Sequence, residues 1–110
     1  AEAPRCVLLP LHEGALRVPV GDILYAEAFS HTLELHTTSG IHSLKIGMNM
    51  LEELLGEGFF RCHRSYLANV GRIRQVTRTA LRLEGGVELP LARQRYDAAN
   101  RAFIDYPGGD

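Results

Sequence analysis

The stretch 59–70, FFRCHRSYLANV, restricts the fold of this chain more than any other. Apolar and polar side chains alternate over residues 59–63, which is the period-two pattern of a strand with one buried and one polar side. The alternation breaks at Arg64, and apolar residues resume over 66–70. The pattern therefore predicts a strand, a sharp turn and a second strand, with Arg64 at the turn.

Short apolar runs bounded by turn-forming residues occupy much of the remaining chain. They predict strands at residues 6–9, 15–18, 23–28, 32–36, 41–45, 81–83 and 87–91. Two stretches show helical spacing instead. One is Met48–Leu55, where Asn49 and Glu52 fit a capping box. The other covers 94–104, before a Pro-Gly-Gly tail at 107–109 that we expect to be disordered. Many short strands with two short helices indicate a mostly-β fold.

The hairpin around residues 84–86 has a register that the side-chain pattern predicts. A two-residue loop would place Arg82 opposite Leu89 and mix polar with apolar faces. A three-residue loop pairs Leu81 with Leu89 and Arg82 with Glu88. We therefore expect the three-residue loop, with a glycine in the left-handed conformation.

Charge is distributed unevenly along the chain, although the net charge is only −1. Residues 61–95 hold eight arginines against two glutamates, a net charge of +6, whereas residues 1–60 have a net charge of −5. Such segregation can focus a positive field on one face, which favours a polyanionic partner. The alternative is an ordinary solvated face, in which arginines point outward from strands.

Length and composition narrow the class of protein. A chain of 110 residues is expected to form a single domain, 1–110. The sequence shows no apolar run that could cross a bilayer and no signal-peptide pattern, so we expect a cytoplasmic protein without membrane contact. Its cysteines, Cys6 and Cys62, are expected to be reduced thiols in that compartment.

Neither a metal site nor an active site is indicated. The five histidines lack the spacing of ligand pairs, and His31 and His36 would face opposite sides of a strand. Cys62 and His63 are neighbours on a predicted strand and point apart, so Cys62 is expected to pack inward. The sequence contains no paired carboxylates or phosphate-binding loop. We therefore expect no enzyme, no metal and no cofactor.

The 59–70 block resembles the F-x-R-x-H-R-S-Y-x-x-N hallmark of the LytTR-type DNA-binding domain, the output module of many bacterial response regulators. The matching residues are Phe59, Arg61, His63, Arg64, Ser65, Tyr66 and Asn69. Seven matches in one block are a specific signal. The similarity extends over a core at about 16–103, with flexible termini. It implies about ten short strands in several small antiparallel sheets, with a helix between them.

The resemblance also implies a set of DNA-contacting side chains. The three base-contacting residues are His31, Arg64 and Arg93. Some family members carry a smaller amide residue at the position of Arg64, so the resemblance leaves open whether Arg64 reads a different base or holds a phosphate. The expected phosphate contacts are Ser30, Lys45, Arg61, Ser65, Arg72, Gln94 and Arg95. His63 and Asn69 are expected to brace the turn through hydrogen bonds to its backbone.

The function expected from the resemblance is sequence-specific binding of double-stranded DNA by a bacterial transcriptional regulator, with loop side chains in successive major grooves. In this family two copies often bind direct repeats, so weak self-association or pairing on DNA is expected. A receiver domain usually precedes the module, and a redox switch at Cys62 has a precedent. The alternative is a β-rich protein-interaction module whose arginine-rich face docks an acidic partner.

Overall fold

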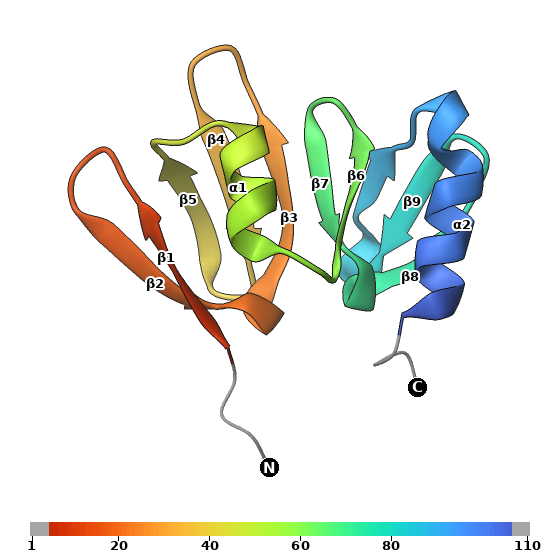
Figure 1. Cartoon of the computed structure of the whole chain (residues 1–110), viewed down its shortest axis with the longest axis horizontal. Helices are drawn as coiled ribbons and strands as arrows, with labels where there is room; N and C mark the ends of the chain where they lie inside the picture. Colours follow the sequence, from red (N-terminus) through yellow and green to blue (C-terminus); the bar gives the residue numbers. More distant parts are fainter. Residues whose placement is uncertain (1–4, 107–110) are drawn as a thin grey trace.

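Short antiparallel strands dominate the protein. The computed structural model describes residues 5–106, and within that range it contains ten strands and two helices (Figure 1). The strands are β1 Cys6–Pro10, β2 Ala15–Pro19, β3 Ile23–Ala28, β4 Leu33–Thr37, β5 Gly40–Leu44, β6 Phe59–His63, β7 Tyr66–Asn69, β8 Ile73–Val76, β9 Ala80–Leu83 and β10 Glu88–Pro90. The helices are α1 Met48–Leu55 and α2 Tyr96–Asp105. The mostly-β prediction is confirmed, and β8 is the strand that it missed.

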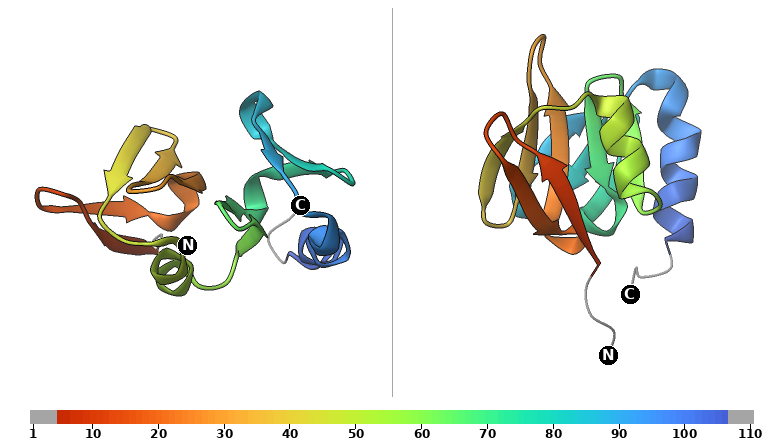
Figure 2. Two further views of the ribbon diagram at one scale, coloured as in Figure 1. Left: turned by 90° about the horizontal axis from the view of Figure 1, so that it is seen from above. Right: turned by 60° about the vertical axis from the view of Figure 1, so that its left-hand side comes forward.

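The strands form a β1–β2 ribbon, a five-stranded sheet in the order β5-β4-β3-β7-β6 and a three-stranded sheet in the order β10-β9-β8. Elements β1 to β5 and α1 make up one lobe, and β6 to β10 and α2 make up the other (Figure 1). The five-stranded sheet therefore runs through both lobes. Both helices lie on the same side of the sheets (Figure 2).

Each lobe has its own apolar core. In the first, Leu9, Leu35 and Leu51 are completely buried. Leu9 belongs to β1, so the β1–β2 ribbon contributes to this core. In the second lobe, Cys62 and Leu81 are completely buried in a cluster that includes the inner face of α2. An eight-residue helix is unstable by itself, so α1 depends on the burial of Leu51 and its apolar neighbours.

Hydrogen bonds at both ends of the β3–β7 pairing join the two lobes. The buried side chain of Asn69 donates to Ile23 O over 2.8 Å and accepts from Gly71 N over 3.0 Å. At the other end, Ala28 N donates to Ser65 O over 2.8 Å. The polar groups of Asn69 are thus paired inside the protein, which removes the cost of burying them.

The hairpin between β9 and β10 has the predicted register. Leu81 lies opposite Leu89, and Arg82 lies opposite Glu88. Arg82 Nε donates to Glu88 Oε2 over 2.9 Å on the exposed side. The two loop glycines have φ angles of 83° and 80°, which lie in the left-handed region that glycine tolerates. The prediction of a three-residue loop is confirmed.

The capping box predicted for α1 is wrong. The residue at the N-cap is Gly47, and no side chain caps the helix. The side chains of Asn49 and Glu52 instead accept hydrogen bonds from Arg61. The two residues of the predicted capping box therefore lie in α1, but their side-chain oxygens accept hydrogen bonds from strand β6 and do not cap the helix.

Helix α2 begins two residues later than predicted. The 3-10 helix η4 (Arg93–Arg95) occupies its expected first turn, and regular α-helix begins at Tyr96. Ala99 is the buried residue of α2 and belongs to the second core.

The tail at 107–109 lies outside the described residues. Neither helix of the described part is long and apolar enough to cross a membrane.

Truncation of Leu51 tests how much α1 depends on its buried side. Leu51→Ala is expected to lower the free energy of unfolding by about 2–5 kcal/mol, because it leaves a cavity in the core. Met50→Ala, at a neighbour that is 51% exposed, is the control and should change stability by less than about 0.5 kcal/mol. Urea unfolding followed by circular dichroism measures both. Equally small effects would contradict the packing of α1.

Candidate nucleic-acid interface

Three segments that are distant in sequence lie along one edge of the protein. They are the β3–β4 loop (29–32), the β6–β7 turn (64–65) and η4 (93–95) at the start of α2. We call these segments the upper edge, after their position in Figure 1. Each contributes one exposed side chain that was predicted to contact bases: His31, Arg64 and Arg93.

Main-chain hydrogen bonds fix the three segments relative to one another. Ala28 N, at the end of β3, donates to Ser65 O in the turn over 2.8 Å. Ala92 N, just before η4, donates to Cys62 O of β6 over 2.8 Å. The spacing of the segments is therefore set by backbone rather than by flexible side chains, which suits a preorganised binding surface.

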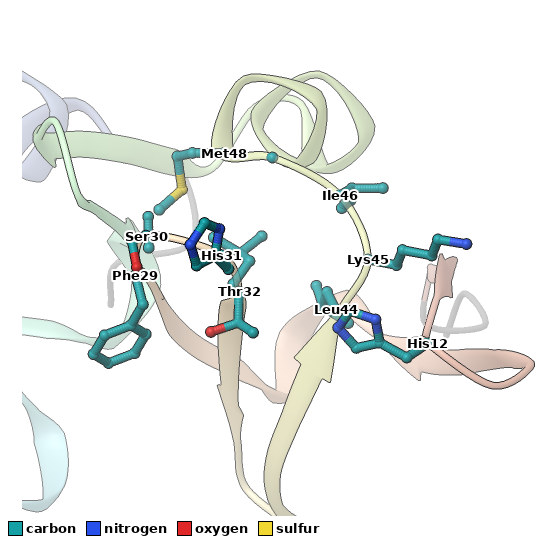
Figure 3. A pocket seen from close by; sticks show the side chains of 12 residues that line it. His12, Phe29, Ser30, His31, Thr32, Leu44, Lys45, Ile46 and Met48 are labelled. Atoms are coloured by element: carbon teal, nitrogen blue, oxygen red, sulfur yellow. The ribbon is translucent and has the colours of Figure 1, made fainter.

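The β3–β4 loop borders an open hollow of about 450 Å³. Phe29 N donates to Thr32 O over 2.8 Å, which closes the loop and leaves Ser30 and His31 exposed. Figure 3 shows these two residues on one side of the hollow and Lys45 on the other, with the Lys45 side chain pointing away from His31. Lys45 therefore adds positive charge beside the loop without contacting His31.

Arg64 is held at the tip of the β6–β7 turn by the residues on either side of it. His63 Nδ1 accepts a hydrogen bond from Ser65 N over 3.1 Å, across Arg64. Beyond the turn, the Tyr66 hydroxyl donates to Glu27 Oε2 over 2.8 Å. This hydrogen bond raises the pKa of Tyr66 to about 12, so the hydroxyl remains a donor at neutral pH. The turn is anchored on both sides, and the Arg64 side chain is exposed.

Asn69, which was expected to brace the turn, and Arg72, which was expected to contact a phosphate, lie elsewhere. Asn69 makes its hydrogen bonds at the far end of β7 and does not touch the β6–β7 turn. Arg72, in the 3-10 helix η2 (Val70–Arg72), pairs with Glu84 and donates to Gly21 O over 2.6 Å. These segments lie at the edge opposite the upper edge (Figure 1).

Two further arginines that were expected to contact phosphates are turned inward. Arg61 donates to two carbonyl oxygens around the β6–β7 turn and to two side chains of α1. Arg95 Nε donates to Arg61 O over 3.1 Å, and its guanidinium carbon lies 4.8 Å from the centre of the Phe60 ring. The guanidinium group of Arg61 is therefore engaged through Nε, Nη1 and Nη2, whereas that of Arg95 is engaged through Nε and its face.

The eight arginines of residues 61–95 divide into two groups. Six make side-chain hydrogen bonds or ring contacts: Arg61, Arg72, Arg74, Arg78, Arg82 and Arg95. Within residues 5–106, the side chains of the remaining two make no hydrogen bond, ion pair or ring contact: Arg64 and Arg93. Most of the arginines in this stretch therefore have a contact within the protein, and the two whose guanidinium groups have none both belong to the upper edge.

Arg78 is a candidate that sequence reasoning missed. Its guanidinium carbon lies 4.6 Å from the centre of the Tyr96 ring. Tyr96 is the first residue of α2 and is close in sequence to Arg93. A cation over an aromatic ring can still offer its edge donors to a third group. Little in the sequence marks Arg78, because it stands between Thr77 and Thr79 in a turn without a periodic pattern.

The thiol of Cys62 is poorly suited to redox or nucleophilic chemistry. Cys62 is a free cysteine, completely buried, and burial raises the pKa of its thiol to about 12. Its own backbone hydrogen bond and the charges of Arg95 and Arg61 act in the opposite direction but are outweighed. The thiolate is the reactive form of cysteine.

Among residues 5–106, no three His, Cys, Asp or Glu side chains gather as metal ligands.

The sequence and the fold match a known class of protein. Residues 13–103 match the family model of the LytTr DNA-binding domain. Because this range covers most of the chain, the protein belongs to that family. It is a DNA-binding domain of the kind that regulates transcription.

Individual relatives agree with this assignment. Over 67 residues the chain is 36% identical to the transcriptional regulatory protein YpdB of Escherichia coli K12, and to its Shigella flexneri counterpart. The match covers 58% of this chain and 27% of YpdB, so it spans about a quarter of that relative. The LytTr DNA-binding domain of a putative methyl-accepting/DNA response regulator from Bacillus cereus has the same fold, with a TM-score of 0.74, 24% identity, and coverage of 96% of this chain and 100% of that chain.

Alkylation tests the state of Cys62. At about pH 8, iodoacetamide should modify Cys62 roughly a thousandfold more slowly in the folded protein than in urea, because a pKa near 12 instead of 9.0 leaves little thiolate. Mass spectrometry of the Cys62 peptide measures both rates. The same shift predicts that stability falls as the pH rises from about 9 towards 12, where only the unfolded state readily ionises. Similar rates in both states would contradict the buried, neutral thiol.

Proposed function

We propose that the upper edge binds double-stranded DNA in a sequence-specific manner, with His31, Arg64 and Arg93 reading bases in successive major grooves. The observation that carries this proposal is the division among the arginines. Arg64 and Arg93 have exposed guanidinium groups with no partner in residues 5–106, whereas the other six arginines of 61–95 are engaged. A donor fork without an internal partner is available to a ligand.

The dimensions of the protein fit this arrangement. The principal extents are 40 × 38 × 24 Å, and the upper edge runs along the longest axis (Figure 1). One turn of B-form DNA is about 34 Å, so loops from the two lobes can reach major grooves that face the same side of the duplex. The β3–β4 loop then serves one groove, and η4 serves the next.

The chemistry of the side chains assigns them different tasks. Arginine can donate two hydrogen bonds to O6 and N7 of guanine, which is worth about 1–3 kcal/mol of discrimination. His31 can donate or accept, so it can recognise several base edges. Exposed or half-buried polar side chains beside the readers are assigned to phosphates, which set the register of the protein on DNA: Ser30, Lys45, Ser65, Arg78 and Gln94.

The setting proposed for this domain is a bacterial response regulator in the cytoplasm. The Bacillus cereus structure comes from a putative response regulator, and the YpdB relatives are transcriptional regulatory proteins much longer than the matched region. We propose that a receiver domain precedes this module and that two copies pair on direct repeats. Pairing on DNA would let a weak self-association act through high effective concentration.

Selection from random double-stranded DNA, read by sequencing, tests the proposed function. Enrichment of a short motif, repeated at about one helical turn, is the expected result. Salt-sensitive retention without enrichment would show that the arginines bind polyanions without reading sequence. Absence of DNA retention would favour a protein-interaction module that docks an acidic partner.

Arg93→Ala separates base reading from general charge. The variant should lower affinity for a selected duplex by roughly tenfold to a hundredfold, but affinity for random DNA by only a few-fold, because a base contact acts only on the right sequence. Arg101→Ala removes the same charge from an exposed position farther along α2 and serves as the control. Fluorescence anisotropy at fixed salt measures both. Equal losses on the two DNAs would contradict base reading by Arg93.

A further inference from the structure

We propose that Arg61 is a positioning residue. It fixes the main chain of Arg64, the proposed base-reading residue, by linking it to helix α1, and it does not contact a DNA phosphate. This inference deepens the proposed function and rests on it. The geometry that supports it is a single guanidinium group lodged between the β6–β7 turn and the first turns of α1.

On the side of the turn, Arg61 binds main-chain oxygen atoms. Arg61 Nη2 donates to Arg64 O over 2.6 Å, and Nε lies 3.2 Å from both Arg64 O and His63 O. The carbonyl of the reader itself is therefore held, while its side chain remains exposed. Hydrogen bonds from a charged donor are stronger than neutral ones, which makes this a firm anchor.

On the side of the helix, the same guanidinium group binds two side chains of α1. Arg61 Nη1 donates to Asn49 Oδ1 over 3.0 Å and to Glu52 Oε1 over 3.2 Å. The side chain of Arg61 is 23% exposed, which is half the exposure of Glu52 at 45%. Because α1 is packed into the first core by buried leucines, it gives the turn in the second lobe a rigid support.

A phosphate could reach only the second hydrogen of Nη2 without breaking one of these hydrogen bonds, because Arg61 has five N–H donors and four are already used. Each of its Nε, Nη1 and Nη2 atoms already donates to a protein acceptor. We propose that Arg61 improves recognition by ordering the backbone of the β6–β7 turn. A long arginine side chain reads a base well only if its backbone is fixed, since ordering a mobile loop on binding costs affinity.

The strand that carries Arg61 also meets the segment of the third reader. Arg95 Nε donates to Arg61 O over 3.1 Å, and Ala92 N donates to Cys62 O over 2.8 Å. Both contacts flank Arg93 and use main-chain oxygens of β6. They do not use the Arg61 side chain, so substitution of that side chain should act on Arg64 before it acts on Arg93.

The test is Arg61→Lys, which keeps the charge but replaces a planar fork by a single ammonium group that cannot span the turn and the helix. The ratio of affinities for a selected duplex and random DNA should fall by roughly tenfold. Affinity for random DNA and its salt dependence should remain unchanged, because no phosphate contact is lost. Arg74→Lys, which alters an arginine paired with Glu84, is the matched control and should leave the ratio unchanged.

Asn49→Ala gives a second measurement in case Arg61→Lys folds poorly. It removes one acceptor of Arg61 on α1 without changing charge, and it should lower the same ratio by a smaller factor, about twofold to fivefold. Thermal unfolding of every variant confirms that the proteins compared are folded. An unchanged ratio in Asn49→Ala and Arg61→Lys, or a reduced salt slope in the latter, would overturn the proposal.

A double-mutant cycle identifies the residue through which Arg61 acts. In an Arg64→Ala background, Arg61→Lys should lower the ratio by less than about twofold, because the reader that it positions is already absent. A tenfold loss in both backgrounds would show that Arg61 acts independently of Arg64. If the wild-type protein enriches no motif at all, the proposed function fails. Enrichment with additive losses would refute only the role of Arg61.

Discussion

The antiparallel pairing of β3 with β7 is the interaction on which the rest of the structure depends. It places Tyr25, Ala26 and Glu27 opposite Ala68, Leu67 and Tyr66, and so makes one continuous sheet from strands of both lobes. Asn69 secures one end of the pairing, and the hydrogen bond from Ala28 N to Ser65 O secures the other. Without it, the β3–β4 loop and the β6–β7 turn would have no fixed spacing, and a shared edge could not form.

Strand β6 plays the corresponding role on the other side of the turn. Its main-chain oxygens receive hydrogen bonds from Ala92 and Arg95, and its Arg61 side chain reaches both the turn and α1. The abundance of arginine in residues 61–95 therefore serves two purposes. Six of these arginines contact acceptors or rings within the protein, and the other two, Arg64 and Arg93, make no such contact among residues 5–106. A protein with a net charge of −1 can expose cations at one edge in this way because its arginines are concentrated in one stretch of the sequence.

Local sequence patterns predicted the parts of the fold that local physics determines. The period-two alternation gave the strand positions, and the positions of Arg82 and Glu88 fixed the register of the β9–β10 hairpin. The motif also predicted Arg64 at the tip of a turn. In each case the evidence lay within a few residues, because strand alternation and glycine conformations are local properties.

The partners of the long polar side chains could not be predicted in the same way. Arg72 contacts Gly21, and Asn69 contacts Ile23, each across more than forty residues of sequence. Asn49 and Glu52 satisfied a helix-start pattern that is just as compatible with binding Arg61. These distant contacts decide which arginines are left without an internal partner, so that division emerges only once both lobes are assembled.

Nuclear magnetic resonance provides the most direct test of the central claim that the upper edge is the DNA-binding surface. Amide chemical shifts of the ¹⁵N-labelled protein would be followed during titration with a selected duplex. The account predicts that the largest changes fall in residues 29–32, 64–65 and 93–95. The largest changes at the opposite edge, in residues 20–22, 70–72 and 84–86, would contradict it.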